Sequence, residues 1–213
     1  MHIFSKINTL FIHIPKTGGT SLVAHFQRRG KEVINLSNRY APPYHQTYLS
    51  IKNHLPNVDD YKIITVIRNP FNRLVSDLLF LKNHFLKNHP YLHQYFLSVD
   101  ELYKPEILEK KVFWYLNDCK NEDIDNHKLE QYKFIINENQ ELVKNILIFR
   151  TETLEKDLKE ASIIDENDTL EKENVSAGLE DYTTFLTDNA KNAIMEYYKI
   201  DFYLWEHKKL PKA

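Results

Sequence analysis

Hydrophobic residues in the first part of the chain alternate between short unbroken runs and helical spacings. The apolar run Leu10–Ile14 predicts a strand, and the β-branched run Tyr61–Ile67 predicts another that is buried on both faces. Helical spacing predicts helices over Thr20–Arg29 and Thr47–Leu55, and Glu32–Leu36 is interpreted as a further strand. Because strands and helices alternate, the sequence predicts a parallel sheet of the α/β class.

The strand at Tyr61–Ile67 leads directly into another predicted helix. Pro70 stands near the first position of this helix, where proline is favoured. Ser76 lies about 200° around the helix from Leu74, because successive residues are about 100° apart. Ser76 is therefore expected in the second turn, on the face opposite the buried stripe. That stripe consists of Leu74, Leu78, Leu81 and Phe85.

The composition is typical of a soluble globular protein, with 42% hydrophobic and 27% charged residues in a chain of 213. This length, without a linker or repeat, predicts a single domain over residues 1–213. The net charge of −2 gives no support for nucleic-acid binding, and the single cysteine, Cys119, excludes a disulfide framework or thiolate metal cluster. No apolar run approaches the ~20 residues of a membrane span and no signal peptide is evident, so a cytoplasmic location is predicted.

The segment after the first predicted strand has the features of a phosphate-binding loop. A strand, a glycine turn and a helix N-terminus follow one another, and the unpaired N–H groups and dipole of a helix N-terminus favour an anion. A lysine supplies a cation, glycines let the backbone close around phosphate, and hydroxyls add donors. The candidate residues are Lys16, Thr17, Gly18, Gly19, Thr20 and Ser21.

This loop is not the P-loop of nucleoside triphosphatases, because its lysine precedes the glycines. A structural turn with a solvated lysine is the alternative, but lysine, glycines and hydroxyls together favour an anion site. A second anion contact is expected from Arg68, at the end of a strand, together with Ser76. Arginine can bind an oxyanion through two parallel N–H···O hydrogen bonds. In parallel sheets, ligands bind beyond the carboxyl ends of the strands. Without the neighbouring glycine loop, the favoured interpretation would be that Arg68 forms a salt bridge with a carboxylate and that Ser76 faces solvent.

Residues 15–21 (Pro-Lys-Thr-Gly-Gly-Thr-Ser) and 68–76 (Arg-Asn-Pro-Phe-Asn-Arg-Leu-Val-Ser) together resemble the sulfotransferases that use 3′-phosphoadenosine 5′-phosphosulfate (PAPS). The resemblance is greatest to their carbohydrate branch, which includes heparan sulfate 2-O- and chondroitin sulfotransferases. It implies a P-loop-like three-layer fold, with a central parallel sheet flanked by helices, and sulfuryl transfer from PAPS to a hydroxyl of a saccharide acceptor. The loop from Lys16 to Ser21 would hold the 5′-phosphosulfate, Arg68 and Ser76 would hold the 3′-phosphate, and no metal is implied.

Later segments continue the resemblance. His127–Ile135 is similar to a His…Gln…Phe-Ile segment of the family, and Ile146–Arg150 to its late strand. Asn174 and Ser176 are similar to the Asn-x-Ser loop that closes over the nucleotide, so both are candidate cofactor contacts. The helix expected at Thr187–Tyr198 also fits the family.

Sulfuryl transfer requires a base for the proton of the acceptor hydroxyl and a cation near the leaving oxygen. His45 is the candidate base, because His45-Gln-Thr resembles the His-x-Thr segment that supplies the base in the family, and an imidazole titrates near pH ~6.5. Lys16 is the candidate for the leaving side. His13 lies within the first predicted strand and is interpreted as a core residue.

A metal site is not predicted. Of the neighbouring histidines His84, His89 and His93, only the last two have helical i, i+4 spacing, and Pro90 interrupts them. Neither a cysteine nor a close carboxylate completes a tetrahedral set. A solvated or acceptor-facing cluster is the favoured interpretation of these histidines.

Two other functions remain open from the residues alone. A nucleotide kinase would need a lysine after the glycines and a Mg²⁺-binding aspartate near a strand end, and Tyr61–Pro70 offers neither. A non-catalytic nucleotide-binding protein would keep the phosphate-binding loop without catalysing a reaction, although the presence of Lys16 and His45 favours catalysis. The near-neutral charge disfavours a heavily sulfated polymer as acceptor, because such substrates are usually steered by basic clefts.

Overall fold

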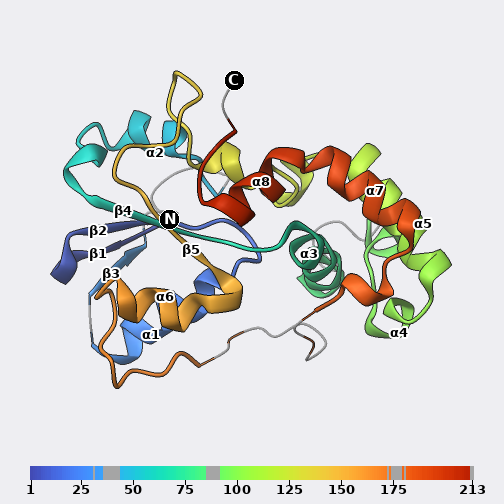
Figure 1. Cartoon of the computed structure of the whole chain (residues 1–213), viewed down its shortest axis with the longest axis horizontal. Coiled ribbons are helices and arrows are strands. Elements are labelled where there is room, and N and C mark those ends of the chain that lie inside the picture. The colour runs from blue at the N-terminus through green and yellow to red at the C-terminus, as the bar shows by residue number, and fades with distance from the viewer. Residues whose placement is uncertain are drawn as a thin grey trace.

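A five-stranded sheet organises the part of the chain that the computed structural model describes, namely residues 1–30, 32–35, 44–84, 92–171, 173, 179 and 181–211. The strand order is β3-β1-β2-β4-β5. Helices lie on both sides of the sheet, and a further group of helices lies beside it (Figure 1). The strands are β1 His2–Phe4, β2 Thr9–Ile12, β3 Val33–Asn35, β4 Lys62–Ile67 and β5 Leu147–Arg150.

Strands β2, β4 and β5 are parallel neighbours. Ile12 of β2 lies opposite Thr65 of β4. Ile67 of β4 lies opposite Arg150 of β5. This confirms the predicted parallel core, and it means that the segments following β2 and β4 leave the sheet at the same edge.

The other edge of the sheet differs from the wholly parallel arrangement that was predicted. β1 is antiparallel to both β2 and β3, and β3 falls inside the predicted strand Glu32–Leu36. A single turn of 3-10 helix, η1 (Ser5–Ile7), and the left-handed Asn8 connect β1 to β2. Such a tight connection permits only an antiparallel pair, since parallel strands need a crossover of roughly a dozen residues. The strand His2–Phe4 was not predicted, because it is too short to show a pattern.

Both faces of the sheet are buried, which confirms the three-layer α/β architecture. Ile64 and Val66 of β4 belong to the core under α1 and α6. Their neighbours Ile63 and Ile67 belong to the core under α2 and α8. The β-branched run therefore packs on both sides, as its unbroken hydrophobicity predicts. These helices are α1 Gly19–Arg28, α2 Tyr48–His54, α6 Leu154–Glu160 and α8 Lys199–His207.

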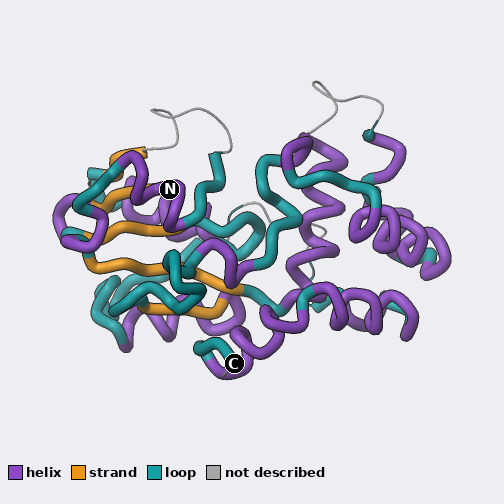
Figure 2. The backbone as a smooth tube through the Cα atoms, turned by 90° about the horizontal axis from the view of Figure 1, so that it is seen from above, coloured by secondary structure: helices purple, strands orange, loops and turns teal. Residues whose placement is uncertain are grey.

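A third core lies among the helices beside the sheet. Figure 2 shows these helices from above. Leu78 of α3, Tyr115 of α5 and Ile194 of α7 are all buried in this core. The predicted stripe of α3 is confirmed at Leu74, Leu78 and Leu81, and Phe85 lies outside the described residues. The helices of this group are α3 Pro70–His84, α4 Val99–Leu102, α5 Pro105–Asn117 and α7 Asp188–Tyr197. Further 3-10 turns are η3 Val58–Asp60, η4 His93–Tyr95, η5 Glu122–Ile124, η6 Gln131–Phe134, η7 Thr151–Thr153 and η8 Thr183–Phe185.

The other predicted helices are confirmed with small shifts of their ends. The one expected at Thr47–Leu55 is α2, and the hydroxyl of Thr47 accepts from the N–H of Ser50 as a cap. The one expected at Thr187–Tyr198 is α7, capped in the same way by Thr187. Caps of this kind fix helix starts locally, which explains why the sequence located them.

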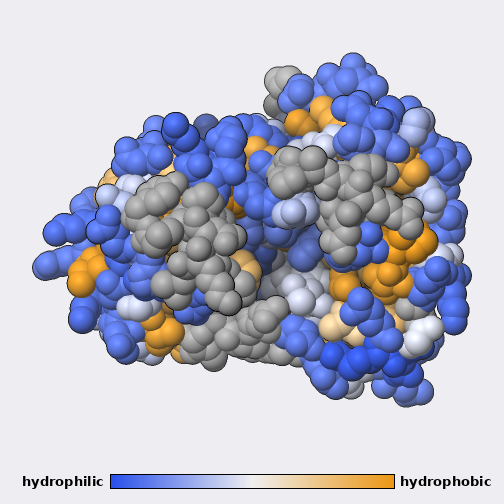
Figure 3. Space-filling view, turned by 180° about the vertical axis from the view of Figure 1, so that it is seen from behind, coloured by the Kyte–Doolittle hydropathy of each residue, from blue (hydrophilic) through white to orange (hydrophobic). Residues whose placement is uncertain are grey.

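The surface is mainly hydrophilic where Figure 3 shows described residues, with hydrophobic side chains gathered in a few places. Among the described residues, no helix combines the length and the apolar character needed to cross a membrane.

A buried carboxylate ties the C-terminal helix α8 to the ends of the parallel strands. Asp201 accepts hydrogen bonds from the backbone N–H groups of Gln131 (2.7 Å) and Tyr132 (3.0 Å). The buried side chain of Gln131 in turn bonds the N–H and the carbonyl of Arg68, each at 2.9 Å. Burial raises the pKa of Asp201 to about 6, against the opposing charge of Arg73. Asp201 thus holds Gln131, and Gln131 holds the backbone at the end of β4.

Asp201 should make stability depend on pH in an unusual direction. Its folded-state pKa of about 6 lies above the ordinary 3.8. The folded state therefore binds this proton more tightly, and the free energy of unfolding should fall as pH rises through this range. Denaturant unfolding of the parent and Asp201→Asn measures the effect, with other groups cancelling in the difference. Going from about pH 7 to about pH 4.5, the difference should shift by about 2 kcal/mol in favour of the parent. A difference that does not change with pH contradicts this assignment.

Candidate active site

The loop between β2 and α1 adopts backbone angles that ordinary residues rarely take. Lys16 has a φ of 64° and Gly18, the N-cap of α1, has a φ of 83°. Glycine suits the Gly18 position because it lacks a Cβ. Gly19 is needed for another reason: a Cβ there would lie 2.5 Å from the ring of His13 and 2.7 Å from that of Phe11. The two glycines therefore let the loop close against β2.

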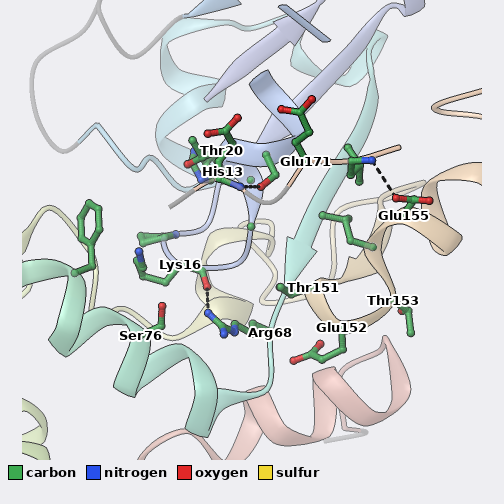
Figure 4. A pocket seen from close by; sticks show the side chains of 18 of the residues that line it. His13, Lys16, Thr20, Arg68, Ser76, Thr151, Glu152, Thr153, Glu155 and Glu171 are labelled. Atoms are coloured by element: carbon green, nitrogen blue, oxygen red, sulfur yellow. Dashed lines mark hydrogen bonds between the residues drawn. The ribbon is translucent and has the colours of Figure 1, made fainter. Parts of the chain in front are cut away.

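The side chain of Lys16 lies at the cavity beside this loop (Figure 4). Its Nζ stands 3.8 Å from the centroid of the Phe80 ring of α3. Burial lowers the pKa of Lys16 to about 8, with Asp77 opposing the shift and Arg68 adding to it. Within the described residues Lys16 has no ion-pair partner. A partly desolvated, unpaired ammonium is well suited to receive an anion.

The three hydroxyls of the loop have different environments. Thr17 is buried and donates to the carbonyl of Ile14 at 2.9 Å, which corrects the expectation that this hydroxyl faces an anion. Ser21 lines the cavity and its Oγ accepts from the N–H of Glu173 at 2.9 Å. Thr20 is exposed and lines the cavity. Thr20 and Ser21 are therefore the hydroxyls of this loop that line the cavity.

Arg68 brings the end of β4 to the first loop. Its Nη1 donates to the carbonyl of Lys16 at 3.2 Å (Figure 4), and its Cζ lies 6.0 Å from the centroid of the Tyr182 ring. Burial lowers the pKa of the guanidinium, which still stays protonated. Ser76 lines the same cavity from α3, and no hydrogen bond to its hydroxyl occurs in the described part of the chain. The two segments singled out from the sequence thus meet.

Thr151, the first residue after β5, connects three strand ends. Its Oγ1 lies 2.7 Å from the carbonyl oxygen of Thr17 and 3.1 Å from that of Ile67. Since a hydroxyl has one proton, the two carbonyls share it. The loop after β2, the end of β4 and the end of β5 are held together at this point.

One cavity of about 730 Å³ contacts both junctions. This volume falls within the range of roughly 300–1,000 Å³ that is usual for small-molecule sites. The predicted site residues that line it are Lys16, Gly18, Gly19, Thr20, Ser21, His45, Arg68 and Ser76. Asn174 and Ser176 lie outside the described residues, as does His89, and nothing is described of the His84 side chain.

Four glutamates also line the cavity, and the described contacts engage each of them. Glu152 accepts from the N–H of Asn69 (2.9 Å) and from Nε1 of Trp205 (3.1 Å). The other three form ion pairs with basic neighbours: Glu155 with Lys159, and Glu171 and Glu173 with Arg28. The ion pairs partly compensate the charge of these three, and the charge of Glu152 acts on Arg68. Within the described residues, neither Lys16 nor Arg68 forms an ion pair.

His45 lines the cavity and is held by a carboxylate. Its Nδ1 lies 2.7 Å from Oδ2 of Asp125, whose other oxygen accepts from the N–H of Tyr44. Burial lowers the pKa of His45, although the hydrogen bond that its Nδ1 makes to Asp125 opposes the shift. His45 is thus neutral near pH 7, with Nδ1 directed at Asp125 and Nε2 left to accept a proton.

A second histidine–carboxylate pair lies beside the first. Nδ1 of His127 bonds Oδ1 of the buried Asp77, and the hydroxyl of Tyr115 donates to the other oxygen of Asp77. The ring centroids of His45 and His127 are 4.9 Å apart, and the His127 ring stacks on Phe80. Both His127 and Phe80 line the cavity.

Sequence reasoning missed several of these lining residues. His13 borders the cavity and is not enclosed in the core, because β2 ends one residue before it. Phe80 could have been predicted to line the site, since it lies one helical turn after Ser76 on the same face of the helix. His45 and Asp125 are 80 positions apart, and no sequence pattern indicates that they pair.

These features define an α/β protein with a cavity, lined by Lys16 and Arg68, at the carboxyl ends of its parallel strands. A family model described as the sulfotransferase family matches residues 2–208. The chain therefore belongs to the sulfotransferase family, and its reaction class is sulfuryl transfer. No curated protein and no solved structure matched the chain.

The Thr151 hydroxyl should support both stability and the shape of the cavity. Thr151→Val removes the donor shared by two carbonyls and keeps the shape of the side chain, so it should cost about 1–3 kcal/mol. Chemical denaturation measures this change. Thr169→Val, at an exposed threonine, is the control and should change stability by less than about 0.5 kcal/mol. Equal effects of the two substitutions would show that the link is unimportant.

Proposed function

We propose that the protein transfers the sulfuryl group of PAPS to a hydroxyl of an acceptor, a saccharide being the favoured class. The supporting observation is that the loop after β2 and the end of β4 open onto one cavity, with Lys16 and Arg68 both at its wall. Within the described residues neither cation forms an ion pair with a carboxylate, and two such cations on adjacent junctions suit a ligand that carries two separate anionic groups.

The two junctions would divide the nucleotide between them. The 5′-phosphosulfate would lie against Lys16, the start of α1 and the hydroxyls of Thr20 and Ser21, where backbone N–H groups and the helix dipole favour an anion. The 3′-phosphate would lie against Arg68 and Ser76. In the family resemblance Asn174 and Ser176 would add contacts from the loop that follows.

His45 would act as the base of the reaction. The acceptor oxygen forms a bond to sulfur while the bond between sulfur and the 5′-phosphate oxygen breaks, so that oxygen gains the electron pair. Nε2 of His45 takes the acceptor proton, because Nδ1 is held by Asp125. Lys16 stabilises the charge that develops on the leaving oxygen. The products are a sulfate ester and adenosine 3′,5′-bisphosphate, and no step is assigned to a metal.

A saccharide acceptor is favoured by the resemblance to the carbohydrate branch. The cavity wall near His45 is formed by aromatic and imidazole rings, among them Phe80, His13 and His127. Rings of this kind pack against the apolar faces of sugars, while the imidazoles bond hydroxyls. Because glutamates accompany the cations at the cavity, a heavily sulfated polymer remains disfavoured.

Arg68→Ala should weaken the binding of adenosine 3′,5′-bisphosphate about 10- to 100-fold, since a charge-assisted contact is worth about 1.5–3 kcal/mol. Isothermal titration calorimetry measures the Kd. Sulfate transfer from labelled PAPS to a panel of glycans, alcohols and phenols then identifies the acceptor class. Unchanged nucleotide affinity in Arg68→Ala would overturn the proposed cofactor site.

Arg150→Ala is a matched control for that experiment. Arg150 also ends a parallel strand and lies opposite Ile67, but its Nη2 donates to the carbonyl of Glu206 at 2.6 Å and it does not line the cavity. Its substitution should leave the Kd within about two-fold, which is less than 0.5 kcal/mol. Equal weakening by both substitutions would indicate a general loss of structure.

Nucleotide affinity should fall as pH rises above about 8, the pKa that burial gives Lys16. A bound anion favours the charged ammonium, so binding takes up a proton at high pH and the Kd increases there. Titration calorimetry with adenosine 3′,5′-bisphosphate across this range measures the dependence. Lys16→Arg should remove it, because arginine stays protonated. An equal dependence in the parent and the variant would assign the titration to another group.

A further inference from the structure

We propose that His45, Asp125 and His127 form a zinc-binding site, and that zinc bound there blocks the base. Each of these residues offers a ligand atom, and the three atoms lie within 4.8 Å of one another. Two imidazoles and a carboxylate are the donor set that Zn²⁺ commonly takes at sites with three protein ligands. The chemistry of this set favours zinc over Mg²⁺ or Ca²⁺, which prefer all-oxygen coordination.

The histidine at 127 is already oriented as a metal ligand would be. Its Nδ1 is bound to Asp77, which leaves Nε2 as the ligand atom. Tyr115 fixes Asp77 through the second carboxylate oxygen, and both residues are buried. A carboxylate on the far nitrogen of a ligating histidine sets the tautomer and raises the basicity of the ligand.

At the other side of the group, His45 and Asp125 already share a proton. Nδ1 and Oδ2 are 2.7 Å apart, closer than two ligands of one zinc, which lie about 3.3 Å apart at bond lengths of about 2.0–2.1 Å. A zinc ion would replace the shared proton while the two atoms separate slightly and the His127 atom moves closer. The Tyr44 N–H bonds Asp125 and the Asn126 side chain bonds the His45 carbonyl, so the surrounding backbone is anchored during this change.

The cavity gives the ion a route of entry and an open coordination position. His45 and His127 both line it, with side chains 21% and 6% exposed. A water molecule would complete the four ligands. The ring of His13, 5.3 Å from that of His45, adds a further nitrogen-bearing neighbour.

Zinc at this position would switch off transfer, because a neutral His45 that ligates zinc through Nδ1 carries its proton on Nε2. That nitrogen then has no lone pair left to take the proton of the acceptor hydroxyl. This consequence rests on the proposed function, whereas binding of the metal does not. The two can therefore fail separately.

Calorimetric titration of the chelator-treated protein with zinc chloride tests the site directly. We expect one ion per chain, and a visible d–d spectrum of tetrahedral type when Co²⁺ replaces Zn²⁺. His127→Ala and Asp125→Asn should each weaken binding at least 10-fold, and Asp77→Asn about 10- to 100-fold by loss of the supporting carboxylate. Circular dichroism establishes that each variant is folded. His54→Ala, at the exposed end of α2, is the matched control and should bind zinc like the parent.

Absence of stoichiometric binding, or binding that His127→Ala and Asp125→Asn leave unchanged, would overturn the zinc site. Sulfate transfer should be inhibited at the zinc concentration that fills the site. Zinc binding that leaves transfer intact would overturn the inhibitory role alone. Nucleotide affinity measured without zinc, as in the Arg68→Ala experiment, reports on the proposed function independently of either result.

Discussion

The parallel pairing of β2 with β4 is the constraint on which the site depends. Parallel neighbours release their chains at the same edge, so residues that are 52 positions apart in sequence, Lys16 and Arg68, come within hydrogen-bond distance. An antiparallel pairing would send the two junctions to opposite edges. The antiparallel β1 and β3 lie beyond β2, where they extend the sheet without changing this relationship.

Neither Lys16 nor Arg68 is paired with a carboxylate in the described part of the chain. Holding both cations at one cavity in this way has an energetic cost, because burial disfavours charge. The structure offsets this cost with neutral groups. A backbone carbonyl accepts from Arg68, the Phe80 ring faces the ammonium of Lys16, and Gln131 fixes the backbone of Arg68 from both sides. Neutral partners position the cations and leave their charge for an anionic ligand.

Local features of the chain were predictable from sequence, and distant pairings were not. The β-branched run of β4, the cap Thr47 and the glycine turn each act within a few residues, so their patterns are visible. The cavity position of Arg68 followed from strand order alone. By contrast, the carboxylates that hold His45 and His127 come from other segments, and no spacing connects them. The same holds for the short strand β1, whose antiparallel course depends on one tight turn.

The link from Asp201 through Gln131 to Arg68 has a consequence for how the protein is made. The strand that precedes Arg68 is synthesised more than a hundred residues before Asp201, the carboxylate that completes its support. A nascent chain that has released β4 but not α8 already has its loop of glycines, yet it lacks the anchor for the backbone of Arg68. The end of β4 therefore takes its anchored form only after α8 has emerged and docked.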